Sequence, residues 1–223
     1  LIGDALVRHD PGDPTSLDAA RGGLRTTALQ DPPLKPLFGF VKTHAWTDAD
    51  PRTHEAFGEL VDMLGGQVRD VQIEHTTERG SAAAITIQLV ELAHHYGPLL
   101  DRAPDQVSPG LAGRIEEGRR IPASQYVAAL LYRADADRAF REIFLNYSAV
   151  LTPAAPGPAP QGLETTGNPV FCNFWTYLGV PAVTIPALDV DGLPMGVQLV
   201  GGRRDDGRLL RTARWLADHI ETG

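Results

Sequence analysis

Apolar residues recur at two spacings along the chain, and together these spacings predict a mixed α/β fold. Residues 51–64 carry apolar side chains at every third or fourth position, which predicts an amphipathic helix. Asp50 is a typical N-cap residue, Pro51 suits the first helical position, and Gly65-Gly66 is predicted to end the helix. The apolar runs at 38–41 and 68–73 flank this helix and predict short buried strands. Strand, helix and strand with short links are typical of a βαβ unit, so we expect the two strands to be parallel.

The rest of the chain continues the alternation of helices and strands. Helical spacing covers residues 81–100, 122–147 and 209–220, and a weaker helix crosses 110–118 in a segment broken by glycine and proline. Further strands are predicted at 149–152, 182–185 and 195–200, and Asp191-Gly192 forms a hairpin turn between the last two. The apolar face of the long helix is predicted to comprise Tyr126, Leu130, Leu131, Phe140, Ile143, Phe144 and Tyr147.

The first part of the chain lacks such periodicity. Residues 1–37 contain five prolines and are predicted to be an irregular lead-in segment. The whole of 1–223 is predicted to be a single α/β domain, in which helices cover a mixed β-sheet. The N-terminal residues resemble the last turns of a helix that begins upstream, so we expect the chain to be a fragment of a larger domain.

Charge and cysteine content narrow the class of protein. The formal net charge is −8, which disfavours a nucleic-acid or anionic-membrane surface, because both need clustered basic residues. No apolar run approaches the roughly 20 residues that span a bilayer. Cys172 is the only cysteine, which excludes an internal disulfide and is typical of a reducing cytoplasm. We therefore expect a cytoplasmic protein without nucleic-acid or membrane partners.

No local motif for catalysis or cofactor binding is present. The sequence contains neither the G-x-S-x-G elbow of a hydrolase serine nor a glycine-rich phosphate loop. Glu91, His94 and His95 have helical spacing that suits metal ligands, but the second Glu-x-x-His of a di-metal bundle is absent. A solvated helix face is the favoured interpretation. We predict no metal and no cofactor.

Two other short patterns also have simpler explanations. The segment 189–192 carries two aspartates like a calcium loop, but it lacks the remaining ligands, and a hairpin turn is favoured. Cys172 could be a nucleophile if a base lowered its pKa, but no histidine lies near it in the sequence. A buried structural thiol is favoured.

Several longer stretches resemble the amidase-signature family. His9–Ser16 resembles the family's Asp-Pro-x-Asp-Pro-Thr-Ser segment, and Asn173–Ala182 is similar to its Asn-x5-Gly-x-Pro-Ala block. Gly192–Gly201 is similar to the family's Gly-Leu-Pro-x-Gly-x-Gln-x-x-Gly hairpin. The resemblance follows the whole chain in order and is strongest at 9–16 and 147–216.

The resemblance implies the C-terminal part of the amidase-signature fold. The family's Ser-Ser-Lys catalytic residues and its oxyanion loop lie upstream of the matching region, and neither Lys35 nor Lys42 has a matching context. No catalytic residue is therefore expected here. The complete protein is expected to hydrolyse a small-molecule amide to a carboxylic acid and ammonia or an amine through an acyl-serine. Its partners would be that substrate and the missing N-terminal half, and a homo-oligomer stays open.

Phe171, Asn173 and Trp175 are the candidate substrate-binding residues, forming one wall of the pocket. They precede a predicted strand in a segment punctuated by glycine and proline, where we expect a loop. The alternative is that Phe171 and Trp175 fill the core. Two alternatives for the whole chain are a non-catalytic binding or assembly module, and an independent hydrolase that uses Cys172 or a serine with a histidine.

Overall fold

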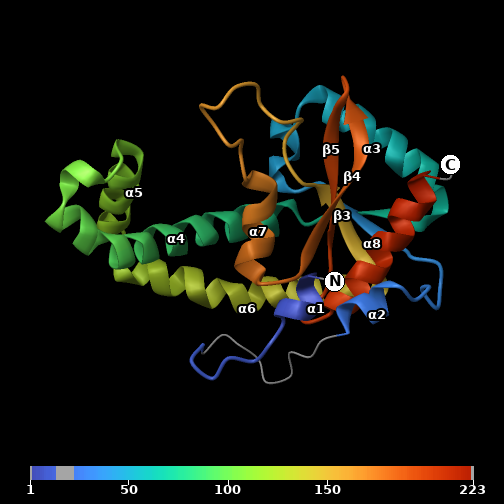
Figure 1. The fold of residues 1–223 in the computed structure, drawn as a ribbon, viewed down its shortest axis with the longest axis horizontal. Helices are drawn as coiled ribbons and strands as arrows, with labels where there is room; N and C mark the ends of the chain where they lie inside the picture. Colours follow the sequence, from blue (N-terminus) through green and yellow to red (C-terminus); the bar gives the residue numbers. More distant parts are fainter. Residues whose placement is uncertain (1, 14–22, 222–223) are drawn as a thin grey trace.

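A single mixed sheet organises the chain (Figure 1). The computed structural model describes residues 2–13 and 23–221, so the Pro14–Ser16 end of the first family-like motif lies outside the described residues. Within these described residues, five strands run in the order β2-β1-β3-β5-β4. Their bounds are β1 Phe38–Val41, β2 Val68–Val71, β3 Ala149–Pro153, β4 Ala182–Val190 and β5 Leu193–Val200.

Pairing in the sheet confirms the predicted parallel unit and the predicted hairpin. β1 pairs in parallel with β2 on one side and with β3 on the other. β5 lies antiparallel between β3 and β4. Asp191 and Gly192 connect β4 to β5 with positive φ values of 54° and 79°, as a tight hairpin turn requires. The predicted mixed α/β class is therefore confirmed.

One face of the sheet is covered by α3 (Pro51–Leu64) and α8 (Asp206–Glu221) (Figure 1). Phe40 of β1 stacks on Phe57 of α3 with ring centroids 6.0 Å apart, and both are buried in a cluster that includes residues of α8. The α3 signals behave as predicted, because the Asp50 side chain caps the helix and Gly65 ends it. The short helix α2 (Leu24–Ala28) packs on α8.

The opposite face is covered by α4 (Glu74–Arg102), α6 (Ala123–Asn146) and α7 (Val170–Leu178). Their buried core centres on Phe140, Phe174 and Trp175. Away from the sheet, α4 and α6 extend as a long pair of helices, and α5 (Pro109–Arg120) packs on α4 near their outer end (Figure 1).

In its described residues, 2–13 and 23–37, the lead-in segment contains two short helices. Helix α1 (Ile2–Leu6) presents the Asp4 carboxylate to the start of α2, where it accepts hydrogen bonds from the backbone N–H groups of Gly23, Leu24 and Arg25. These bonds, of which that from Arg25 contributes most, lower the pKa of Asp4. The carboxylate thus satisfies N–H groups that a helix start leaves without a backbone partner.

Several sequence expectations were wrong in position. Helix α4 begins at Glu74, seven residues before the predicted start. Leu131 of α6 is 69% exposed, although we assigned it to the apolar face. Pro186 lies inside β4, which continues to Val190 through a register shift between Ile185 and Leu188. The segment around Phe171 is helix α7, not the loop that we expected.

In the described part of the chain, every helix is too short or too polar to cross a bilayer.

Candidate functional site

The carboxyl ends of the parallel strands form the edge at which α/β sheets commonly bind ligands. After β1 the chain leads through a 3₁₀ turn, His44–Asp48, into α3 on one face of the sheet. After β2 it enters α4 on the other face and returns at β3. The connection that leaves β1 and the one that leads to β3 thus lie on opposite faces of the sheet, although β1 and β3 are neighbouring strands. The residues that follow these two strands are therefore the first candidates for a site.

The turn after β1 packs directly on α7. Ala45 and Ala49 form a small buried cluster with Phe171, and Val170 packs against its rim. The Thr43 hydroxyl accepts a hydrogen bond from the Ala45 backbone N–H and starts the turn. The first turn of α7 is therefore held beside the end of β1.

His44 connects the same turn to α4. Its backbone N–H donates to the Thr77 hydroxyl at 3.0 Å, and its Nδ1 lies 3.3 Å from that oxygen. Burial lowers the pKa of His44, while the nearby Glu78 and Asp48 carboxylates partly oppose the shift. The lowered pKa favours the neutral form of the imidazole. A neutral imidazole can donate or accept a hydrogen bond at this edge.

Gln198 of β5 fixes the start of α7 to the end of β3. Its side-chain Nε2 donates to the backbone oxygens of Pro153, at 3.1 Å, and Phe171, at 3.2 Å. Gln198 is buried, so both bonds form away from water. Gln198, which belongs to the hairpin that resembles the family's, therefore connects the end of β3 to the start of α7.

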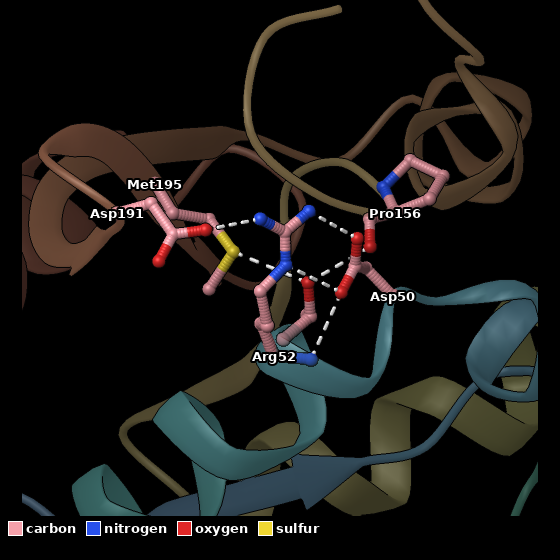
Figure 2. Close-up of polar contacts among 6 residues, drawn as sticks. Asp50, Arg52, Pro156, Asp191 and Met195 are labelled. Carbon is pink, nitrogen blue, oxygen red and sulfur yellow. Dashed lines mark hydrogen bonds and ion pairs between the residues drawn. The ribbon is translucent and has the colours of Figure 1, made fainter.

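A hollow of about 500 Å³ opens at this edge, between the start of α3 and the loop that follows β3. Its lining includes Asp48, Asp50, Arg52, Pro156, Gln161 and Leu193. Figure 2 shows Arg52 extended between Asp50 on one side and Asp191 of the hairpin turn on the other. Side chains from three distant parts of the sequence therefore meet at one rim.

Asp50 and Arg52 form the most connected ion pair of the rim. Asp50 Oδ1 accepts from the Arg52 backbone N–H and Nε, both at 2.9 Å, and Oδ2 accepts from Nη2 at 2.6 Å. These bonds, first of all those from the Arg52 side chain, lower the pKa of Asp50 to about 2. Arg52 also donates to the Asp191 carboxylate. Asp50 is therefore ionised throughout the physiological range.

The loop after β3 is anchored at the same point. The Asp50 backbone N–H and the Thr53 hydroxyl both donate to the Pro156 backbone oxygen at 2.8 Å. The start of α3 thus holds the loop that forms the opposite wall of the hollow (Figure 2). With two aspartates and one arginine in its lining, this hollow offers mainly hydrogen-bond acceptors to a ligand.

The three predicted pocket residues occupy different environments on α7. Phe171 and Trp175 are each 1% exposed, Phe171 against the turn after β1 and Trp175 against Phe140. Asn173 is half-buried. Residues at i and i+4 share a helix face, whereas i+2 lies on the other side. The helix therefore groups Phe171 with Trp175 and turns Asn173 away from them, and the pocket-wall assignment stays a prediction.

Cys172 has the properties of a structural thiol. Its Sγ donates to the Ala154 backbone oxygen at 3.4 Å, and burial raises its pKa, which disfavours the nucleophilic thiolate. Ser108 caps α5, and the Ser148 hydroxyl accepts from the Leu37 backbone N–H. Ser108, Ser148 and Cys172 thus bond to backbone groups, and the ring nitrogens of His44 and His54 contact the Thr77 hydroxyl and the Trp46 backbone oxygen, not a serine or a cysteine.

The metal pattern seen in the sequence is not assembled in the fold. Within 2–13 and 23–221, no group of three His, Cys, Asp or Glu side chains could hold a metal ion. Glu91 instead accepts a hydrogen bond from the Tyr126 hydroxyl at 3.3 Å.

Comparison with known proteins gives one consistent result. The family model described as Amidase matches residues 1–210. A glutamyl-tRNA(Gln) amidotransferase subunit of Jannaschia sp. (strain CCS1) is 38% identical over 96% of this chain and 50% of its own length. The chain spans about half the length of the curated relatives that it matches.

Solved structures share the fold. An inhibitor-bound vestigial protein complex, which bears on the origins of an s-triazine catabolic enzyme, has a TM-score of 0.82 at 23% identity. The match covers 96% of this chain and 50% of that one. A bacterial aryl acylamidase of the amidase signature family has a TM-score of 0.72 at 18% identity, covering 96% of this chain and 49% of that one. These likenesses confirm the predicted fold class.

Proposed function

This chain belongs to the amidase family, and from that premise we propose that it is the C-terminal portion of an enzyme that hydrolyses a small-molecule amide. The products are a carboxylic acid and ammonia or an amine. The reaction passes through an acyl-serine, which divides one difficult step into two easier ones. The nucleophilic serine, its partner serine and the lysine base belong to the half that precedes residue 1.

Two observations support this proposal: the family model matches residues 1–210, and the chain spans about half the length of its curated relatives. The sheet supports it. Within the described residues, β4 pairs only with β5 and ends the sheet. It is nine residues long, and Val183 and Ile185 on it are half-buried. Except at Pro186, which has no N–H, an edge strand presents outer N–H and C=O groups with which a further strand can pair. We place the missing half along this edge.

The role of this portion is to support and bound the pocket. Asn173 is proposed to contact the amide substrate, with Phe171 and Trp175 shaping the wall behind it. The hollow beside Asp50 and Arg52 is polar at its rim and is held by hydrogen bonds from α3, so it suits a fixed boundary of a substrate cavity. We further propose that the complete enzyme is cytoplasmic.

Ammonia or amine release from a panel of simple aliphatic and aromatic amides tests the proposal. The complete protein is expected to turn over at least one of them, and residues 1–223 alone none. Turnover by 1–223 that is lost in Cys172→Ala, or in a serine variant, would establish an independent hydrolase and overturn the proposal. Absence of turnover by the complete protein on every amide, together with a stable partner complex, would identify an assembly module instead.

A further inference from the structure

A second hollow, of about 510 Å³, lies where the chain leaves β5, at the edge of the sheet opposite the first. It opens between the last turns of α6, the segment 202–205 and the start of α8. Its charged lining residues are Arg141, Arg203, Arg204, Arg208, Asp137 and Asp205. The lining therefore carries a surplus of two positive charges, in a chain whose net charge is −8.

Hydrogen bonds hold the guanidinium groups of this lining in place. Asp137 lies between Arg141, at 2.8 Å, and Arg203, at 3.5 Å, and the Arg141 bond is the main cause of its lowered pKa. Arg203 also donates to the Leu178 backbone oxygen at the end of α7. The Asp137 carboxylate and the Leu178 carbonyl thus hold Arg141 and Arg203 at the hollow. The single carboxylate can neutralise only one of the two positive charges.

Arg208 and Arg204 complete the positive lining. Arg208 Nη2 donates to the Tyr147 backbone oxygen at 3.0 Å, and Nη1 lies 3.4 Å from the Asp205 carboxylate. Arg204 is exposed and takes no part in the hydrogen bonds and ion pairs that hold Arg141, Arg203 and Arg208. The hollow therefore combines anchored positive charge with an exposed guanidinium.

The remaining lining is apolar. Phe144 and Val180 are half-buried, and Leu145 is 81% exposed beside them. Small-molecule sites typically combine such apolar walls with a few fixed polar groups. Guanidinium groups bind carboxylates and phosphates through paired N–H donors.

We propose that this hollow binds a small organic anion, in which a carboxylate or phosphate group is attached to a compact apolar body. The oxyanion lies against Arg204 and Arg141, and the apolar body lies against Phe144 and Val180. The site is separate from the proposed amide pocket, because the two hollows share no residue.

Titration of the complete protein with phenyl phosphate and with benzoate, followed by calorimetry, tests the site. Each variant Arg204→Gln and Arg141→Gln is expected to raise the Kd about tenfold, since each loses charge-assisted hydrogen bonds. Both side chains are exposed, so these variants are expected to fold. Arg138→Gln is the matched control: it removes the same charge from an exposed position of α6 that is not part of the lining, and the Kd should not change.

Inorganic phosphate and benzyl alcohol separate the two halves of the ligand. Both are expected to bind much more weakly than phenyl phosphate. Equal binding of inorganic phosphate overturns the apolar part of the proposal, and equal binding of benzyl alcohol overturns the anionic part. Binding that is unaffected by both arginine variants, or absent for both probes, overturns the site itself.

Discussion

Arg52 and Asp191 form an ion pair although 139 positions separate them in the sequence (Figure 2). The pair joins the first turn of α3 to the tip of the β4–β5 hairpin. Both side chains are substantially exposed, and such pairs contribute little to global stability. Its consequence is therefore local: it fixes the position of the hairpin tip over the hollow beside Asp50.

Replacement of Arg52 is expected to change the titration of Asp50. In the wild-type protein the pKa of the Asp50 carboxyl is about 2. Arg52→Met removes the side-chain donors but keeps the backbone donor, so the pKa should rise toward, without reaching, the ordinary value of about 3.9. Carbon-detected NMR of the carboxyl group measures the midpoint.

The direction of the stability change follows from this shift. Because the folded pKa of Asp50 lies below its unfolded value, the stability that this group contributes is present above the unfolded value and is lost as the pH falls through about 2. In Arg52→Met the contribution is smaller, and acid unfolding should begin at a slightly higher pH. Arg138→Met, which removes an exposed pair on α6, should leave the Asp50 midpoint unchanged. An unchanged midpoint in Arg52→Met itself would contradict the assignment.

Gly118 allows α5 to approach α4. A Cβ atom at this position would lie 2.0 Å from the Leu89 backbone oxygen, so Gly118→Ala must push the two helices apart. We expect a loss of about 2 kcal/mol in the free energy of unfolding, and faster amide exchange in α5. Gly113 on the same helix has open space, and Gly113→Ala should instead stabilise by up to about 1 kcal/mol. Equal effects of the two variants would refute the close-approach explanation.

Gln198 is expected to control the order of the first turn of α7. Gln198→Met removes the donor to Pro153 and Phe171 while keeping a similar volume. Each of these two carbonyls then loses one hydrogen bond, which should lower the free energy of unfolding by about 2 kcal/mol. Hydrogen exchange should accelerate at the start of α7 more than in α3. Uniform acceleration in both helices would indicate a general loss of stability.

The raised pKa of Tyr177 predicts that the folded state loses stability at alkaline pH. Its hydroxyl donates to the Ala129 backbone oxygen at 2.6 Å, and burial is the main cause that raises its pKa to about 12. Since the folded pKa exceeds the unfolded value of about 10, the stability that it contributes is complete below pH 10 and is lost as the pH rises through about 12. Tyr177→Phe should lower stability at neutral pH by about 1 kcal/mol. Denaturant unfolding from pH 9 to 12 should show a weaker decline for this variant, and an identical decline would exclude Tyr177 as the titrating group.

Asn173→Ala tests the proposed pocket wall in the complete enzyme. Loss of a hydrogen bond to the bound amide should raise KM about tenfold with little change in kcat, because ground state and transition state lose the same contact. Thr176→Ala is the control, since Thr176 is exposed on the same helix. If neither kinetic constant changes in Asn173→Ala, Asn173 does not contact the substrate.

Local signals explain which elements could be predicted. Asp50, Pro51 and Gly65 mark the ends of α3 by effects that act within one helical turn, and the structure confirms each of them. Asp191-Gly192 specifies a hairpin because the turn needs two residues with positive φ. Helix α7 was mistaken for a loop, because nine residues between Pro169 and Gly179 are too few for a clear helical period.

The amino-acid sequence by itself determined the alternation of strands and helices, the turns between them and the family, because capping, periodicity and short motifs act between near neighbours. Only the tertiary structure decided which of those elements meet. It placed Arg52 against Asp191 and four arginines around one hollow, and it exposed Leu131 on a face that we expected to be buried. Such contacts join residues far apart in the chain, and they follow from how the helices pack on the two faces of the sheet, which no local pattern encodes.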